Sequence, residues 1–141
     1  MNKLTVIDCE LCNSTGGALL WNDDFCRVVL VDDADYPGFC RVILNRHVKE
    51  MTDLSAAERA RLMNRVFAVE AAIQEFVAPD KINLASLGNA VPHLHWHVIP
   101  RWRDDRHFPK PIWAPEERYA VPRRHLDAGA LALRLQQHLQ S

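Results

Sequence analysis

The sequence predicts an α+β protein with a mainly antiparallel sheet of about five strands, one long helix and a C-terminal helix. Three observations support this fold class. Short β-branched runs lie between clusters of turn residues, one long segment has helical periodicity, and the 141 residues are 48% hydrophobic and 25% charged, which is typical of one globular domain. We therefore expect a single domain over residues 1–141, in which residues 101–141 form a proline-rich extension and the terminal helix.

Five segments are predicted as strands, because apolar and β-branched residues fill them and turn residues bound them. They are residues 19–21, 25–31, 39–44, 81–86 and 93–99. The turn cluster of residues 32–38 joins the second and third segments in a hairpin with a long loop. Gly88 and Asn89 end the fourth strand, and Pro100 is expected to end the fifth.

The long helix is predicted over residues 55–77. Ser55 and Glu58 fit a capping box at its start, where their side chains satisfy free backbone donors, and Pro79 stops the pattern at its end. Apolar residues recur between them at helical spacing; they are Leu62, Met63, Val66, Phe67, Ile73, Phe76 and Val77.

The region after the last strand is expected to be an extended loop, since residues 101–125 hold four of the eight prolines. We interpret three of its aromatic residues as packing over the sheet, with cover of a ligand pocket as the alternative; they are Trp102, Phe108 and Trp113. Arg101 is expected to face either a phosphate or solvent. Asp127 is positioned to cap a last helix, in which leucines follow at i, i+4 and i+8, namely Leu131, Leu135 and Leu139.

Charge and hydropathy exclude several classes of partner. The formal net charge is −1, and the mildly basic segment 101–141 mixes both signs, so it lacks the clustered basic stripe of a nucleic-acid-binding protein. There is no run of about 18 apolar residues to cross a membrane, and residues 1–8 do not resemble a secretory signal. We expect a cytoplasmic protein that binds neither nucleic acid nor membrane; a small anionic ligand is compatible with this charge.

Two of the four cysteines have a spacing that carries chemistry. Cys9 and Cys12 form a C-x-x-C pair, which suggests metal or redox chemistry before a structural disulfide in a chain without a secretory signal. Cys26 and Cys40 lie among apolar residues, and we expect them to be inert buried thiols.

Three histidines alternate with apolar residues in the last predicted strand. On a strand His93, His95 and His97 would share one face. The outer two would lie about 13 Å apart at their backbones, too far to bind one metal ion, although two adjacent histidines could do so. The triple therefore favours a row of donors and a nucleophile along an extended anion such as a polyphosphate. Imidazole can attack phosphorus when neutral and donate to oxygen when protonated.

The motif His93-x-His95-x-His97 resembles the signature of the histidine triad (HIT) superfamily of nucleotide hydrolases and transferases. The resemblance covers roughly residues 8–102. It includes the hairpin residues from Tyr36-Pro37-Gly38 to Arg46-His47 and the segment 88–92 before the triad. It implies the HIT-like fold for the predicted strands and helices.

The resemblance also implies a mechanism. His95 would attack the α-phosphorus of a nucleoside phosphoramidate or dinucleoside polyphosphate, and water would then resolve the nucleotidyl-histidine. His97 would contact the phosphate and help to protonate the leaving group, and no catalytic metal is required. Substrate contacts would come from Asn89, Asp32, Asn83 and His93.

A structural zinc ion is a further implication of the resemblance. In zinc-bearing relatives the C-x-x-C pair is completed by the histidine after the hairpin strand and by the first triad histidine, which gives the set Cys9, Cys12, His47 and His93. Relatives are commonly homodimers joined through the long helix and a strand, so a homodimer is expected here.

Two alternatives stay open. A nucleotide-binding or sensing module with weak or no catalysis is favoured by two departures from the family pattern, since Phe39 stands where many relatives have histidine and Asn89 where they have glutamine. A zinc-dependent hydrolase with His93 and His95 as metal ligands is the other.

Overall fold

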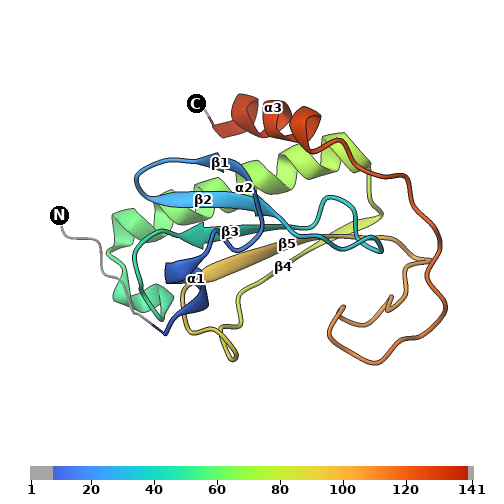
Figure 1. The fold of residues 1–141 in the computed structure, drawn as a ribbon, viewed down its shortest axis with the longest axis horizontal. Helices are drawn as coiled ribbons and strands as arrows, with labels where there is room; N and C mark the ends of the chain where they lie inside the picture. Colours follow the sequence, from blue (N-terminus) through green and yellow to red (C-terminus); the bar gives the residue numbers. More distant parts are fainter. Residues whose placement is uncertain (1–7, 140–141) are drawn as a thin grey trace.

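The computed structural model describes residues 8–139, and the expectation of no secretory signal falls largely outside this range. Its centre is a five-stranded antiparallel sheet with the strand order β1-β2-β3-β5-β4 (Figure 1). The strands are β1 (Ala18–Asn22), β2 (Cys26–Leu30), β3 (Cys40–Leu44), β4 (Lys81–Ala85) and β5 (His95–Arg101). The predicted α+β class and the number of strands are confirmed.

The helices are α1 (Glu10–Asn13), the 3-10 helix η1 (Met51–Asp53), α2 (Ala56–Val77) and α3 (Ala128–Leu139). The two longest, α2 and α3, lie on the same side of the sheet (Figure 1). The predicted capping box starts α2, since the Glu58 amide donates to Ser55 Oγ and the Ser55 amide donates to Glu58 Oε1. Asp127 Oδ1 likewise accepts from the Ala130 amide at the start of α3. No helix of the described chain is long and apolar enough to span a membrane.

Each face of the sheet has its own cover. The face that includes Val28, Val42 and Val98 packs against α2, and the leucines predicted for α3 complete this core, because Leu131, Leu135 and Leu139 are buried. The opposite face carries the alternate side chains of the same strands. There the cover consists of α1 and of the extended segment that follows β5. These segments cover their face less completely than α2 and α3 cover the other, which leaves room for a site.

Three features differ from the sequence prediction. Strand β5 begins at His95 rather than at residue 93, and it runs through Pro100 to Arg101 instead of ending before them. Helix α1 and η1 were not expected. Phe67 is 52% exposed although its spacing suggested a core position. It follows the buried Val66 by one residue, and one helical step turns a side chain about 100° away from its neighbour.

The segment after β5 is anchored to the sheet by a buried ion pair. Arg101 is 2% exposed, and its Nε donates to Asp105 Oδ2 over 2.8 Å. It therefore faces neither phosphate nor solvent, contrary to both expectations. Burial opposes ionisation of Asp105, but hydrogen bonds from Arg101 and from backbone N–H groups hold the pKa of this carboxyl well below its usual range. The anchor fixes the start of the extended segment and hence its path over the open face.

Candidate active site

A cleft of about 310 Å³ lies on the open face of the sheet, beside β5. Its walls include His95 and His97 of β5, Arg41 of β3 and Trp113 of the extended segment. The two histidines are two residues apart on one strand, so they point to the same face. Arg41 is paired directly opposite His97 in the adjacent strand. The sheet register thus brings three nitrogen-bearing side chains to one hollow.

The ring of His95 has a defined orientation and a defined neutral tautomer. It is 9% exposed, and its Nδ1 lies 2.6 Å from the carbonyl oxygen of His93. A carbonyl oxygen only accepts hydrogen bonds, so Nδ1 carries the hydrogen and the neutral ring keeps its lone pair on Nε2. A backbone contact therefore fixes which nitrogen of His95 is available as a nucleophile.

His97 lies in a more apolar setting. It is 6% exposed, and its ring contacts Phe39 and Trp113 at centroid distances of 5.8 and 5.1 Å. Its buried Nδ1 has no hydrogen-bond partner among residues 8–139. Burial, followed by the proximity of His95 and Arg41, lowers the pKa of His97 to about 4. The ring is therefore neutral near pH 7, where it can still donate through one N–H.

This pKa predicts a loss of stability in acid. Between pH 6.5 and 4 the unfolded chain binds a proton at residue 97 that the folded chain does not, so acidification favours unfolding across that window. From pH 7.5 to pH 5.0, His97 should remove about 2 kcal/mol from the free energy of unfolding. Urea denaturation at the two pH values measures this loss.

The variant His97→Gln provides the control, because it has no titrating group at this position. Its loss of unfolding free energy between the same pH values should be smaller than that of the wild type by about 2 kcal/mol. Equal losses in the two proteins would show that His97 titrates normally in the folded state.

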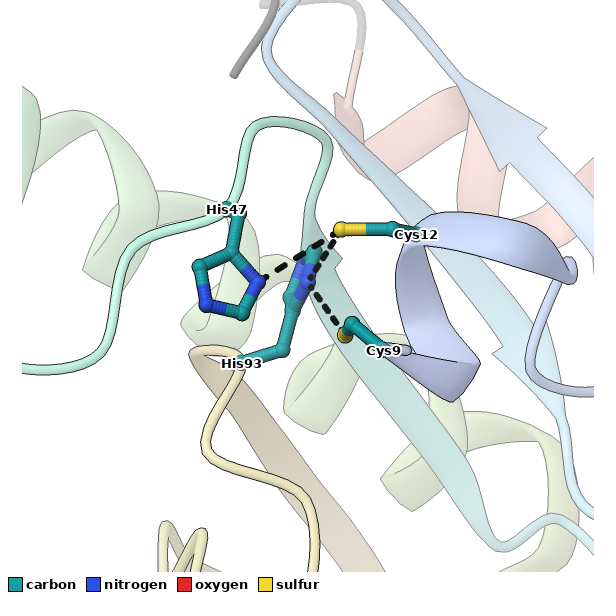
Figure 2. Close-up of side chains that lie close together, drawn as sticks. All are labelled: Cys9, Cys12, His47 and His93. Atoms are coloured by element: carbon teal, nitrogen blue, oxygen red, sulfur yellow. Dashed lines mark hydrogen bonds between the residues drawn. The ribbon is translucent and has the colours of Figure 1, made fainter. Parts of the chain in front are cut away.

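A second cluster lies at one end of β5, where the chain approaches the strand. Sulfur and ring nitrogen atoms of Cys9, Cys12, His47 and His93 all lie within 4.8 Å of one another. Figure 2 shows both cysteines of the α1 region and the two rings converging from separate segments. Nδ1 of His93 lies 3.4 Å from Cys9 Sγ and 3.5 Å from Cys12 Sγ, and Cys12 Sγ lies 3.5 Å from Nδ1 of His47.

These distances suit a tetrahedral zinc ion. With zinc–sulfur bonds of about 2.3 Å and zinc–nitrogen bonds of about 2.0–2.1 Å, tetrahedral sulfur and nitrogen ligands stand about 3.6 Å apart. The Nε2 of His93 lies 2.6 Å from the carbonyl oxygen of Leu44, which leaves Nδ1 as the nitrogen with a lone pair for a ligand bond. The residues present therefore fit a closed Cys₂His₂ site.

His93 departs from the predicted row of three histidines. Both of its ring nitrogens are engaged, one toward the cysteines and the other at Leu44, so the ring is not available to a substrate. The reason is local: residues 93 and 94 lie before the strand, where the Leu94 amide donates to the carbonyl of Val48. The metal-ligand cluster of the described chain includes His93 but not His95, which argues against a zinc-dependent hydrolase built on this pair.

The remaining predicted substrate residues are spread over three hollows. Asn89 is exposed and lines the histidine cleft. Asn83 lines an adjoining hollow, which shares Trp113 with the cleft, and its Oδ1 accepts from Arg101 Nη1 over 2.7 Å. Asp32 is exposed in a separate hollow by the hairpin loop. The structure thus brings Asn89, but not Asp32, to the cleft that holds His95 and His97.

Two wall residues of the cleft differ from what the sequence analysis favoured. Trp113, for which packing over the sheet was favoured and cover of a ligand pocket was the alternative, is 51% exposed, lies against His97 and lines the cleft. The packing interpretation holds for Trp102, which is partly buried against a cluster that contains Tyr36. Arg41 was missed altogether. A charged residue inside an apolar strand marks the face away from the core, but only the β3–β5 register shows that it lies opposite His97.

Comparison with known proteins agrees with this geometry. The structure superposes on a histidine triad protein from Marinobacter aquaeolei VT8 with a TM-score of 0.73 and 26% identity, over 97% of each chain. An AP-4-A phosphorylase of Mycobacterium tuberculosis (strain CDC 1551 / Oshkosh) is 33% identical over 78 residues, which cover 51% of this chain and 40% of that protein. An asymmetrical bis(5'-nucleosyl)-tetraphosphatase of Schizosaccharomyces pombe (strain 972 / ATCC 24843) is 32% identical over 74 residues, covering 49% and 41%.

The fold and the paired histidines on its open face thus place the molecule in the class of histidine triad proteins. The HIT domain model matches residues 15–104, and the chain belongs to the HIT domain family. This range contains the hairpin, helix α2 and strand β5, as the sequence motif indicated. The matched segments span about two fifths of the length of each of the two curated relatives.

Proposed function

We propose that this protein is a nucleotidyl hydrolase that acts at the α-phosphate of nucleoside phosphoramidates or dinucleoside polyphosphates. The proposal rests chiefly on one observation: the Nδ1–H of His95 is held by the His93 carbonyl, so the lone pair of Nε2 is left for the cleft. Membership of the HIT domain family supports the same conclusion, and so does the similarity to an AP-4-A phosphorylase and to a bis(5'-nucleosyl)-tetraphosphatase.

The proposed reaction has two displacements at phosphorus. His95 Nε2 donates its lone pair to the α-phosphorus, a P–N bond forms, and the bond to the leaving amine or phosphate breaks with its electron pair. His97 contacts the phosphate and donates an N–H hydrogen bond to the leaving group, and a leaving amine takes its proton from solvent, while Asn89 donates to a phosphate oxygen. A water molecule then attacks phosphorus and releases a proton to solvent, the P–N bond breaks with its electron pair returning to His95 Nε2, and the nucleoside monophosphate leaves. Sugar contacts by Asp32 and Asn83 stay predictions.

Trapping of the covalent intermediate tests this function. Protein mixed with a nucleotidyl donor labelled at the α-phosphate and quenched within a turnover should carry acid-labile label on residue 95, found by peptide mapping. A sensing module is the second candidate, favoured by the lack of a polar partner for His97 Nδ1 within the described residues. Tight nucleotide binding without label and without turnover of any donor would establish the sensor and refute the hydrolase.

We also propose that zinc occupies the Cys₂His₂ cluster as a structural ion. Cys9 and Cys12 of the α1 region, His47 after β3 and His93 before β5 would hold it. The ion would supply cross-linking and no reaction step, because all four coordination positions are filled by protein. Since His93 also provides the carbonyl that orients His95, a zinc ion bound to His93 would help to hold His95 in its orientation.

A homodimer is proposed as the assembly. Strand β4 lies at one edge of the sheet and pairs only with β5 in the described chain, so its outer backbone groups can pair with a second copy. We expect sedimentation equilibrium to give twice the chain mass of 16.1 kDa. A mass equal to one chain at micromolar concentration would rule out the dimer.

A further inference from the structure

Arg41 occupies a position in the cleft that the proposed reaction has not used. It lies on β3 opposite His97 and lines the same hollow as both histidines. It is only partly exposed, and its Nη1 donates to the carbonyl of Gly16 over 3.1 Å. Its side chain is therefore held over the open face of the sheet rather than extended into solvent.

Charge gives the first argument for a ligand at Arg41. The cleft wall carries one guanidinium, that of Arg41, and one carboxylate, that of Glu10. His97 is neutral near pH 7 and adds no positive charge. Glu10 is exposed, where water screens its charge, whereas a phosphate entering the cleft loses water and requires an opposite charge. Among the residues that line the cleft, Arg41 is the one with a side chain that can supply this positive charge.

Unsatisfied hydrogen-bonding groups give the second argument. The Nε of Arg41 is buried and has no hydrogen-bond partner among residues 8–139, and the same is true of Nδ1 of His97 across the strand pair. A buried donor left without a partner costs free energy unless a ligand satisfies it. The guanidinium edge that includes Nε is the part of arginine that binds two oxygens of a phosphate at once.

We propose that Arg41 is a substrate-binding residue that pairs with the reacting phosphate and makes the site select a nucleotide over the uncharged nucleoside. This inference rests on the proposed function and adds a cation to it. Asn89 donates a hydrogen bond without neutralising charge, so the two residues have separate tasks. The ligand class is a phosphate ester or phosphoramidate of a nucleoside, with its phosphorus within reach of His95.

Calorimetric binding of adenosine 5'-monophosphate and of adenosine tests the assignment at low ionic strength. The wild type should bind the monophosphate more tightly than adenosine. Arg41→Gln should weaken monophosphate binding about 10-fold or more, as expected for loss of a charged hydrogen bond, and leave adenosine affinity within about 2-fold. Arg41→Lys keeps the positive charge but loses the paired N–H donors of the guanidinium. Its affinity for the monophosphate should therefore lie between those of the wild type and Arg41→Gln.

Arg27→Gln is the matched control. Arg27 lies on the neighbouring strand β2 and also anchors the N-terminal segment, by donating to the carbonyls of Leu11, Ser14 and Thr15, but it does not line the cleft. Loss of Arg27 should change the affinities for adenosine 5'-monophosphate and for adenosine by the same factor. The same equal shift in folded Arg41→Gln would make Arg41 an anchor and overturn the inference, as would an unchanged preference for the monophosphate. A wild type that binds neither ligand overturns the proposed function together with the inference.

Discussion

Replacing His95 with alanine should lower the turnover of an adenosine phosphoramidate by about 10³-fold or more, since removal of a catalytic nucleophile has effects of this size or larger. Alanine has no lone pair to attack phosphorus, so the covalent route is lost and only attack by water remains. The fold should persist, because His95 lies at the edge of a cleft and not in the core that α2 covers. Steady-state release of AMP, with thermal melting alongside, measures both effects.

Two further variants sharpen this test. His125→Ala removes an exposed histidine outside the cleft and should leave turnover unchanged. His97→Ala should slow turnover by about 10² to 10³-fold, the usual effect of removing one hydrogen-bond donor to charge that develops in the transition state, without preventing labelling of His95. Unchanged turnover in His95→Ala would refute the nucleophile assignment, and labelling of that variant would point to another residue.

The fold was largely predictable because its signals are local. The capping box of Ser55 and Glu58, the leucines of α3 and the β-branched runs each depend on residues close in sequence. Helix α1 escaped prediction because it has four residues and its position depends on contacts with distant segments, among them the bond from Arg27 to Leu11. Local periodicity contains no information about such contacts.

The site was predictable where one strand sets its geometry. His95 and His97 share a face because they are two residues apart on β5. His93 follows the same spacing, but its ring bonds to Leu44 and it stands before the strand, so strand periodicity no longer describes it. Arg41 lies 56 positions from His97 in sequence and meets it only through the register of β3 with β5. The position of Arg41 in the site therefore depends on how β3 pairs with β5, and the residue pattern within one strand does not contain this information.

Removal of zinc is expected to have the largest effect on stability. Protein purified without chelator should contain about one zinc ion per chain, and chelation should lower the free energy of unfolding by about 3 kcal/mol at free zinc a hundredfold above Kd. The reason is that a bound ion would join three segments far apart in sequence, at Cys9 and Cys12, at His47 and at His93. Urea denaturation with buffered zinc and with chelator measures the difference.

The double substitution Cys9→Ser and Cys12→Ser should abolish both the bound zinc and the zinc-dependent difference in stability. Cys26→Ala is the matched control: this thiol is buried in the core beneath α2, so its loss costs packing but should leave the zinc content at one ion per chain. Zinc far below one ion per chain in the wild type would contradict the site. Because His95 lies outside the ligand set, folded protein stripped of zinc should still form the covalent intermediate. Loss of labelling before any loss of structure would instead make the ion catalytic.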